Sequence, residues 1–329
     1  MSGINGLKQA KHYKTATDGT IICELCPHYC RILSDESGLC RSRKNTAGKL
    51  FTLNYAHTVS LNLDPIEKKP LYHFFPGSQI LSIGPNSCNL SCDFCQNYSI
   101  SQNEVATKQL HPAELLDLCK KNYIAMVAYT YTEPITWFEF VLESSELLKT
   151  NNIQTVMVTN GFINPEPLSQ LLPYIDAMNI DLKSMNDDFY KDICGGSLKP
   201  VLETIKTVSK YCHLEITNLL ITDENDSDVE IQELTDFIAS VNPEIPLHLS
   251  RYHPDYKRGN PATPSAVLER AYNTALKKLS YVYLGNIASG KSTYCPECAA
   301  PVIKRAYKSA SHLDKNKCSE CDRIIYGRF

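Results

Sequence analysis

Eleven of the fourteen cysteines in this 329-residue chain fall into three groups with the spacing of metal ligands, and no other feature constrains the fold as strongly. The groups are an N-terminal set (Cys23, Cys26, Cys30, Cys40), a central set (Cys88, Cys92, Cys95) and a C-terminal set (Cys295, Cys298, Cys318, Cys321). Disulfides belong to oxidising compartments, but residues 1–14 lack the apolar core of a signal peptide. We therefore expect a cytoplasmic protein whose grouped cysteines bind metal.

Three cysteines, Cys119, Cys194 and Cys212, stand outside these groups. An isolated cysteine in a cytosolic chain is usually a small buried apolar residue. We expect that of all three.

The charge balance argues against two classes of partner. The chain has 33 basic and 36 acidic residues, a net charge of −3, and no long run of either sign. Binding to nucleic acid or to anionic membranes normally requires a basic surface. No uninterrupted apolar stretch is long enough to span a bilayer. We expect neither a membrane nor a nucleic-acid partner.

Short apolar runs alternate with amphipathic stretches in the middle of the chain, which is typical of an α/β fold. We expect strands over 79–84, 124–130, 153–159, 177–183, 214–221 and 245–251, and helices over 112–122, 134–151, 198–211, 228–241 and 264–279. Such alternation predicts a parallel sheet with right-handed crossovers. Periodicity alone does not separate an open sheet from a full or partial barrel.

The cysteine groups suggest three parts. Residues 1–75 form a Cys-rich metal-binding segment, residues 76–290 the main domain, and residues 291–329 a compact tail.

The central group follows the first predicted strand as Cys88-Asn-Leu-Ser-Cys92-Asp-Phe-Cys95. Three thiolates in eight residues can ligate three irons of a [4Fe–4S] cubane, whereas electron-transfer ferredoxins use four cysteines per cluster. The fourth iron would be an open coordination site, as in catalytic zinc centres. The alternative is a structural zinc site of three cysteines and a histidine.

This motif, followed by Gln96-Asn97, resembles that of the radical S-adenosylmethionine (SAM) superfamily, and its C-x-N ending resembles the pyruvate formate-lyase activating enzymes. The resemblance implies a partial (β/α)6 barrel over 76–290. It also implies an enzyme whose open iron chelates SAM and whose reduced cluster cleaves it to a 5′-deoxyadenosyl radical.

Further positions match that family at predicted strand ends. The resemblance implies that Glu133 accepts hydrogen bonds from the methionine ammonium of SAM, although Tyr131 and Thr132 replace two glycines of the usual motif. Other cofactor-binding residues implied by it are Asn160 in Thr-Asn-Gly, Asp181 and Lys183 in Asp-Leu-Lys, with Lys183 on the methionine carboxylate, and His248 near the nucleoside. Taken singly, each could be an ordinary capping, surface or core residue.

The flanking groups each offer four thiolates. The C-terminal set, two C-x2-C pairs, has the spacing of a zinc ribbon and predicts a closed structural zinc site. Zinc and an auxiliary iron–sulfur cluster both suit the N-terminal set, and we favour zinc there. His28 lies inside this set and could replace one thiolate or support the ligands.

The N-terminal motifs, Asp64-Pro-Ile-Glu-Lys-Lys-Pro-Leu-Tyr-His73, Ser250-Arg-Tyr-His-Pro-Asp-Tyr256 and the tail together resemble the radical enzymes of the AmmeMemoRadiSam system. That resemblance implies Memo-like and AMMECR-domain proteins as partners, besides an electron donor such as ferredoxin or flavodoxin.

Three functions follow from these patterns. The first is a radical SAM oxidoreductase that abstracts hydrogen from an unidentified substrate, with the protein supplying orientation and shielding. A narrower version is a glycyl-radical activase acting on a partner protein. The third, of a different class, is a non-catalytic metal-binding adaptor.

Overall fold

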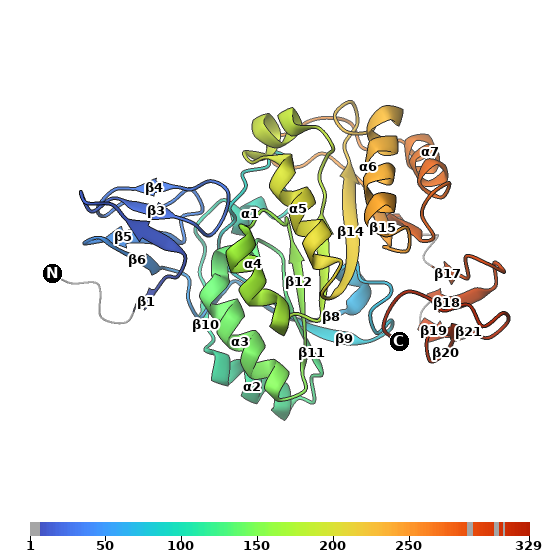
Figure 1. The fold of residues 1–329 in the computed structure, drawn as a ribbon, viewed down its shortest axis with the longest axis horizontal. Coiled ribbons are helices and arrows are strands. Elements are labelled where there is room, and N and C mark those ends of the chain that lie inside the picture. Colours follow the sequence, from blue (N-terminus) through green and yellow to red (C-terminus); the bar gives the residue numbers. More distant parts are fainter. Residues whose placement is uncertain (1–6, 288–291, 306–308, 312) are drawn as a thin grey trace.

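An eight-stranded sheet forms the centre of the protein (Figure 1). The computed structural model describes residues 7–287, 292–305, 309–311 and 313–329. The strand order is β16-β15-β14-β13-β12-β11-β9-β8, and all neighbours pair in parallel except β8 with β9. The strands are β8 (Ser60–Pro65), β9 (Gln79–Gly84), β11 (Met126–Tyr129), β12 (Gln154–Thr159), β13 (Ala177–Asp181), β14 (His213–Leu220), β15 (Leu247–Arg251) and β16 (Val282–Gly285).

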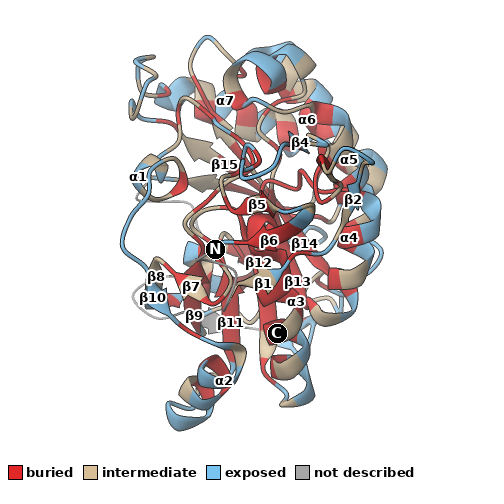
Figure 2. Cartoon of the chain, turned by 90° about the vertical axis from the view of Figure 1, so that its left-hand side faces the viewer, coloured by how far each residue is buried: buried red, intermediate tan, exposed pale blue. Residues whose placement is uncertain are grey.

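One face of the sheet is covered by helices. They are α2 (Pro112–Lys121), α3 (Phe138–Thr150), α4 (Pro165–Leu171), α5 (Leu198–Val208), α6 (Asp228–Val241) and α7 (Ser265–Ala275). Alternate strand residues such as Val127, Ile180 and Leu249 point into this layer and are fully buried. Figure 2 shows the helices with exposed residues on their outer sides and buried residues toward the sheet. These amphipathic helices therefore supply most of the core.

The opposite face is covered near its amino end by the segment 66–75, which includes the 3₁₀ helix η1 (Ile66–Lys68). Ile66, Leu71 and Phe74 of this segment pack against Ala128 and Val156 of the sheet. The backbone N–H groups of Tyr72 and His73 donate to the carboxylate of Glu215, at 3.0 and 2.7 Å. This segment leaves the carboxyl ends of the strands as the open side of the sheet.

The N-terminal part forms small antiparallel sheets at one end of the molecule (Figure 1). Its strands are β1 (Lys8–Gln9), β2 (Tyr13–Thr15), β3 (Ile21–Cys23), β4 (Arg31–Ile32), β5 (Arg43–Thr46), β6 (Lys49–Thr52) and β7 (His57–Thr58), the last paired with β10 (Lys108–Gln109). A buried ion pair at 2.7 Å between Arg43 and Glu139 of α3 attaches it to the main domain.

The C-terminal tail lies at the other end of the molecule (Figure 1). It contains β17 (Thr293–Tyr294), β18 (Pro301–Arg305), β19 (Ser309–Ser311), β20 (Leu313–Asp314) and β21 (Lys317–Cys318). His73 holds it to the body, with Nδ1 bonded to the carbonyl of Tyr326 and Nε2 to the hydroxyl of Tyr283, both at 2.6 Å. Since a carbonyl only accepts, the His73 proton lies on Nδ1 and Tyr283 donates to Nε2.

All six predicted strands and all five predicted helices are present, and the α/β class is confirmed. The boundaries shift by a few residues, because helix ends turn into 3₁₀ structure, as at η2 (Pro134–Trp137) before α3. The sequence pattern did not predict β8, β16, α1 (Tyr98–Ser101), α4 with the 3₁₀ helix η3 (Leu172–Tyr174) after it, or the π-helix η4 (Phe189–Cys194). Residues 60–65 of β8 pair with β9, so the central sheet extends across the proposed boundary at residue 75. The division into three parts and the partial barrel stay predictions.

Candidate functional site

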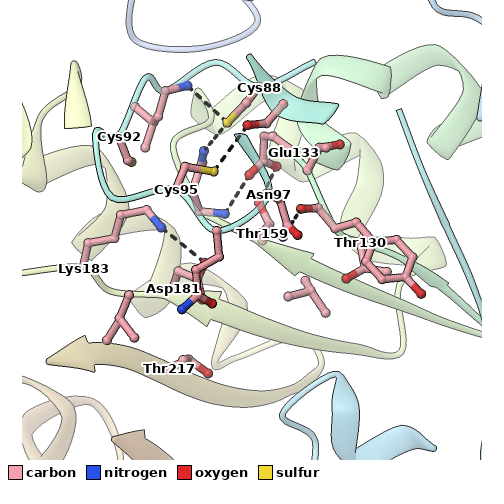
Figure 3. Close-up of a pocket in the computed structure, with 18 of the residues that line it drawn as sticks. Cys88, Cys92, Cys95, Asn97, Thr130, Glu133, Thr159, Asp181, Lys183 and Thr217 are labelled. Carbon is pink, nitrogen blue, oxygen red and sulfur yellow. Dashed lines mark hydrogen bonds and ion pairs between the residues drawn. The ribbon is translucent and has the colours of Figure 1, made fainter. Parts of the chain in front are cut away.

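A cavity of about 470 Å³ opens at the carboxyl ends of the parallel strands (Figure 3). It is lined by Thr130 after β11, by Thr159 and Asn160 at the end of β12, by Asp181 of β13 and by Thr217 of β14. Its volume is in the range of small-molecule sites. In parallel α/β proteins this edge of the sheet is where ligands bind, because the connecting loops converge there.

The loop after β9 brings Cys88, Cys92 and Cys95 into this cavity. Two donors approach the Cys88 sulfur: the backbone N–H of Leu90 at 3.4 Å and Nδ2 of Asn160 at 3.8 Å. Gly84, at the end of β9, lets this strand lie close to the backbone at Thr130, since a Cβ there would be 2.2 Å from the Thr130 carbonyl oxygen. Hydrogen bonds to sulfur are typical of iron–sulfur ligation.

The cysteine loop rests on the end of η4. The backbone N–H groups of Ser91 and Asp93 donate to the carbonyls of Cys194 and Ile193, at 2.8 and 3.2 Å. Gly195 follows with φ +72°, and a Cβ there would lie 2.6 Å from the Ser91 hydroxyl. Cys194 is fully buried, as expected, and it also lies beside Cys92 of the cysteine loop. It therefore supports the loop, a role that its isolated position in the sequence did not suggest.

These three thiols fit a cluster better than a single zinc ion. Among the described residues lining the cavity there is no histidine and no fourth cysteine. The only described group of Cys, His, Asp or Glu ligand atoms that all lie within 4.8 Å of one another is elsewhere, in the C-terminal set. The predicted zinc alternative of three cysteines and a histidine lacks its histidine here. The residues present therefore suit a [4Fe–4S] cluster with one iron free to bind a ligand.

Glu133 is buried beside the cysteines at the start of η2 (Figure 3). Its carboxylate accepts from the Thr159 hydroxyl at 2.7 Å and from the backbone N–H groups of Asn160 and Ile135, at 2.8 and 3.0 Å. Burial raises the pKa of Glu133 to about 7, although these donors oppose the shift. A carboxylate desolvated in this way favours a cationic partner.

Lys183 and Asp181 meet below the cysteines, with Nζ 3.3 Å from Oδ2 (Figure 3). Burial opposes the charge of Lys183, but the Asp181 carboxylate and the nearby thiols hold its pKa above the ordinary value. Asn160 donates to Oδ1 of Asn89 at 2.8 Å, which fixes its side chain against the cysteine loop. The cavity thus brings together four of the five predicted cofactor-binding residues, Glu133, Asn160, Asp181 and Lys183.

His248 lies outside the cavity lining, contrary to expectation. Its Nε2 lies 2.6 Å from Glu215, which also bonds His213 at 2.9 Å. The ring stacks near Tyr283 and is only 3% exposed. Ser250, two residues further along β15 on the same face, lines the cavity instead, because it is nearer the carboxyl end of the strand.

One wall of the cavity comes from residues to which the sequence analysis gave no role. Asp64, Lys69 and Tyr131 line it, and the Asp64 carboxylate accepts from Lys69 Nζ at 2.9 Å and from the Tyr131 hydroxyl at 2.6 Å. Tyr131 has φ +71°, a left-handed conformation that favours glycine. Two features of the sequence could have indicated this wall: Tyr131 stands where the family usually has a glycine, and Asp64 begins a motif shared with the AmmeMemoRadiSam enzymes.

The four C-terminal cysteines form a compact group, with their sulfurs all within 4.8 Å. The Cys295–Cys321 and Cys298–Cys318 sulfur pairs are 3.6 and 3.7 Å apart. The N-terminal cysteines line a second, small pocket together with His28, whose Nε2 is bonded to the carbonyl of Asn89 at 2.6 Å.

Among the described helices, none has the length and apolar character needed to cross a bilayer.

Comparisons with known proteins agree with this site. The profile of the radical SAM superfamily matches residues 82–235. The uncharacterized protein MJ0808 of Methanocaldococcus jannaschii is 39% identical over 332 residues, 97% of this chain and 99% of that protein. The pyruvate formate-lyase-activating enzyme of Clostridium pasteurianum is 26% identical over 173 residues, 50% of this chain and 72% of that enzyme.

Among solved structures, a radical SAM methyltransferase from Sphaerobacter thermophilus has a TM-score of 0.52 at 14% identity, over 64% of this chain and 67% of that one. At this identity the likeness concerns the fold alone. The chain therefore belongs to the same family as MJ0808 and contains a radical SAM superfamily domain over residues 82–235, which includes the cysteine motif.

Proposed function

We propose that the cavity binds a [4Fe–4S] cluster and SAM, and that the enzyme uses them to abstract hydrogen from an organic substrate. The observation that carries the proposal is the meeting of three thiols, a buried carboxylate and a partly buried ammonium in one cavity. When bound, the reduced cluster and SAM supply a 5′-deoxyadenosyl radical.

In this proposal the residues of the chain hold the amino-acid end of SAM. Glu133 would accept hydrogen bonds from the ammonium group, since it is desolvated and its carboxylate faces the cavity. Lys183 would pair with the carboxylate of SAM, with Asp181 holding the lysine in place. Asn160, fixed by Asn89, would lie between the cysteine loop and the bound molecule.

Shielding is the second task of the protein. The wall of Asp64, Lys69 and Tyr131 encloses the cavity on the side opposite the helices, and the Lys69 side chain is only 3% exposed. A closed cavity keeps water and other hydrogen donors away from a reactive radical.

The test compares Cys88→Ala with Cys119→Ala, a buried cysteine in α2 outside the cavity. Both proteins are reconstituted anaerobically and assayed for 5′-deoxyadenosine with dithionite and SAM. The wild type and Cys119→Ala should form the product, whereas Cys88→Ala should form none. Equal product from all three proteins would overturn the proposal.

A second variant tests the binding role of Glu133. Glu133→Gln keeps the size of the side chain but removes its charge, so SAM binding should weaken by about tenfold to a hundredfold. Isothermal titration of the reconstituted protein measures this. Unchanged affinity would remove Glu133 from the site.

A narrower candidate is glycyl-radical activation of a partner protein, supported by the similarity to an enzyme named for activating pyruvate formate-lyase. Electron paramagnetic resonance of mixtures with candidate partners decides it, since a radical doublet must appear on the partner. We further propose a ferredoxin- or flavodoxin-type electron donor, and Memo-like and AMMECR-domain proteins as partners, which co-purification would test.

The compact C-terminal group suits a structural zinc ion. A tetrahedron with Zn–S bonds of about 2.3 Å has sulfurs about 3.8 Å apart. The two measured sulfur pairs, at 3.6 and 3.7 Å, come close to this spacing. All four positions are thiolates, so such a site would be closed to substrate.

A further inference from the structure

The N-terminal cysteines form a buried pocket of their own. Cys23 ends β3, and its backbone N–H donates to the Cys30 carbonyl at 3.0 Å, so the chain folds back between them. Cys26 lies in that turn and Cys40 reaches the same pocket from the next loop. All four cysteines line this pocket, and Cys23, Cys26 and Cys40 are buried.

The spacing of these sulfurs differs from that of the C-terminal group. No three of them meet the 4.8 Å spacing that all four C-terminal sulfurs satisfy. One zinc ion draws four sulfurs to about 3.8 Å from each other. In a [4Fe–4S] cubane each thiolate binds a different iron, which sets the sulfurs farther apart. The wider arrangement therefore favours a cluster over a single ion.

Arg43 provides an independent indication of an anionic ligand. Its side chain is 1% exposed and lines the pocket. The two terminal nitrogens are used by Glu139 and by the Lys11 carbonyl, but the buried Nε has no hydrogen-bond partner in the described structure. A buried donor without a partner is costly. A cluster sulfide or a ligating thiolate would accept this hydrogen bond.

This pocket shares its wall with the catalytic cavity. Asn89 lines the N-terminal pocket, and its neighbour Cys88 lines the cavity. The same holds for η2, where Ile135 and Thr136 face the pocket and Glu133, two residues earlier, faces the cavity. A proposed ligand of one site, Cys88, and a wall residue of the other, Asn89, are therefore consecutive in the chain.

We propose that Cys23, Cys26, Cys30 and Cys40 hold a second [4Fe–4S] cluster, adjacent to the catalytic one, that passes electrons to it. This rests on the proposed function for the identity of the electron acceptor. One electron from a low-potential one-electron donor reduces the N-terminal cluster. The same electron then reduces the catalytic cluster and leaves the N-terminal cluster oxidised, with no bond made or broken. The proposal replaces the sequence-based preference for zinc at this set.

The first test is metal analysis of the full chain, reconstituted anaerobically. The wild type should contain about eight irons, eight sulfides and one zinc. The triple variant Cys88→Ala/Cys92→Ala/Cys95→Ala should keep about four irons, with the Mössbauer spectrum of a [4Fe–4S] cluster. About four irons and two zincs in the wild type, with no iron in the triple variant, would overturn the proposal. Neither readout uses SAM, so failure of the proposed function leaves this result unaffected.

The second test concerns adjacency. After full reduction, the electron paramagnetic resonance spectrum of the wild type should show splitting or broadening from two neighbouring spins. The triple variant and Cys23→Ser/Cys26→Ser should each give an unsplit signal from one cluster. A wild-type spectrum equal to the sum of these two would overturn the electron-transfer part. Cys298→Ser, at the C-terminal group, is the matched control and should keep the split spectrum.

Discussion

The N-terminal and C-terminal cysteine sets contain the same four ligands but are built differently. The C-terminal set consists of two equal C-x2-C pairs with 19 residues between them, and its sulfurs converge within 4.8 Å. The N-terminal set is unequal, with three cysteines in eight residues and then nine residues before Cys40. The two sets lie at opposite ends of the molecule (Figure 1).

Their surroundings differ as well. The N-terminal pocket is bordered by a buried arginine and by the catalytic loop, whereas Cys298 of the C-terminal set is exposed. Ligand type alone therefore does not decide what a cysteine set binds. The spacing of the sulfurs and the charge around them separate a structural site from one placed for electron transfer.

The largest difference between the two sets should appear when one ligand of each is removed. Cys26→Ser should lower the iron content by about four per chain and slow 5′-deoxyadenosine formation by about a hundredfold or more, because electrons no longer pass by this route. Cys298→Ser should lose about one zinc and keep its activity within about threefold. Iron and zinc analysis with the product assay checks both. Equal losses of activity would remove the functional distinction.

The next largest effect should be on stability, through the ion pair of Arg43 and Glu139 that attaches the N-terminal part to α3. Arg43→Met leaves Glu139 buried without its partner, which should reduce the free energy of unfolding by about 3–5 kcal/mol. The double variant Arg43→Met/Glu139→Leu should recover most of that loss. Lys206→Met, which removes an exposed ion pair with Glu203, is the control and should change stability by less than about 0.5 kcal/mol. Urea denaturation measures all three, and a double variant as unstable as the single one would contradict the prediction.

The attachment of the C-terminal tail should depend on pH through His73. Burial lowers its pKa to about 3, so the folded state holds the neutral ring. The stabilisation is fully present above the unfolded pKa of about 6.5 and is lost as the pH falls toward the folded value, by about 1.4 kcal/mol per pH unit.

Hydrogen exchange over 313–329 at pH 7.5 and 5.5 measures this dependence. Protection should fall at pH 5.5 in the wild type, whereas His73→Asn should show little difference between the two pH values. The same dependence in both proteins would assign the effect to a group other than His73.

The smallest effect should come from the exposed contact between tail and body. Arg323 and Glu244 are 2.7 Å apart with side chains 41% and 29% exposed. Because solvent screens such a pair, Arg323→Ala should cost about 0.5 kcal/mol or less, as measured by thermal melting. A loss above about 2 kcal/mol would mean that this contact, rather than His73, holds the tail.

The central cysteine motif, six strands and five helices of the main domain, and the α/β class could be predicted from the amino-acid sequence. These features are local: Cys88, Cys92 and Cys95 lie within eight residues, and hydropathy periodicity identified each of the six strands. The resemblance to radical SAM enzymes pointed to Glu133 and Asp181, and their positions at the carboxyl ends of predicted parallel strands agree with a common site.

Features that depend on depth and on contacts between distant segments became apparent in the folded structure alone. His248 lies below the cavity because it precedes Ser250 by two residues on the same face of β15, and antiparallel pairing of β8 with β9 brought Asp64 to the cavity wall. Likewise, Asn89 and His28 became neighbours across 61 residues, which joined the N-terminal pocket to the catalytic loop. Periodicity gives the face on which a side chain lies, but its depth and its partners follow from how the segments pack.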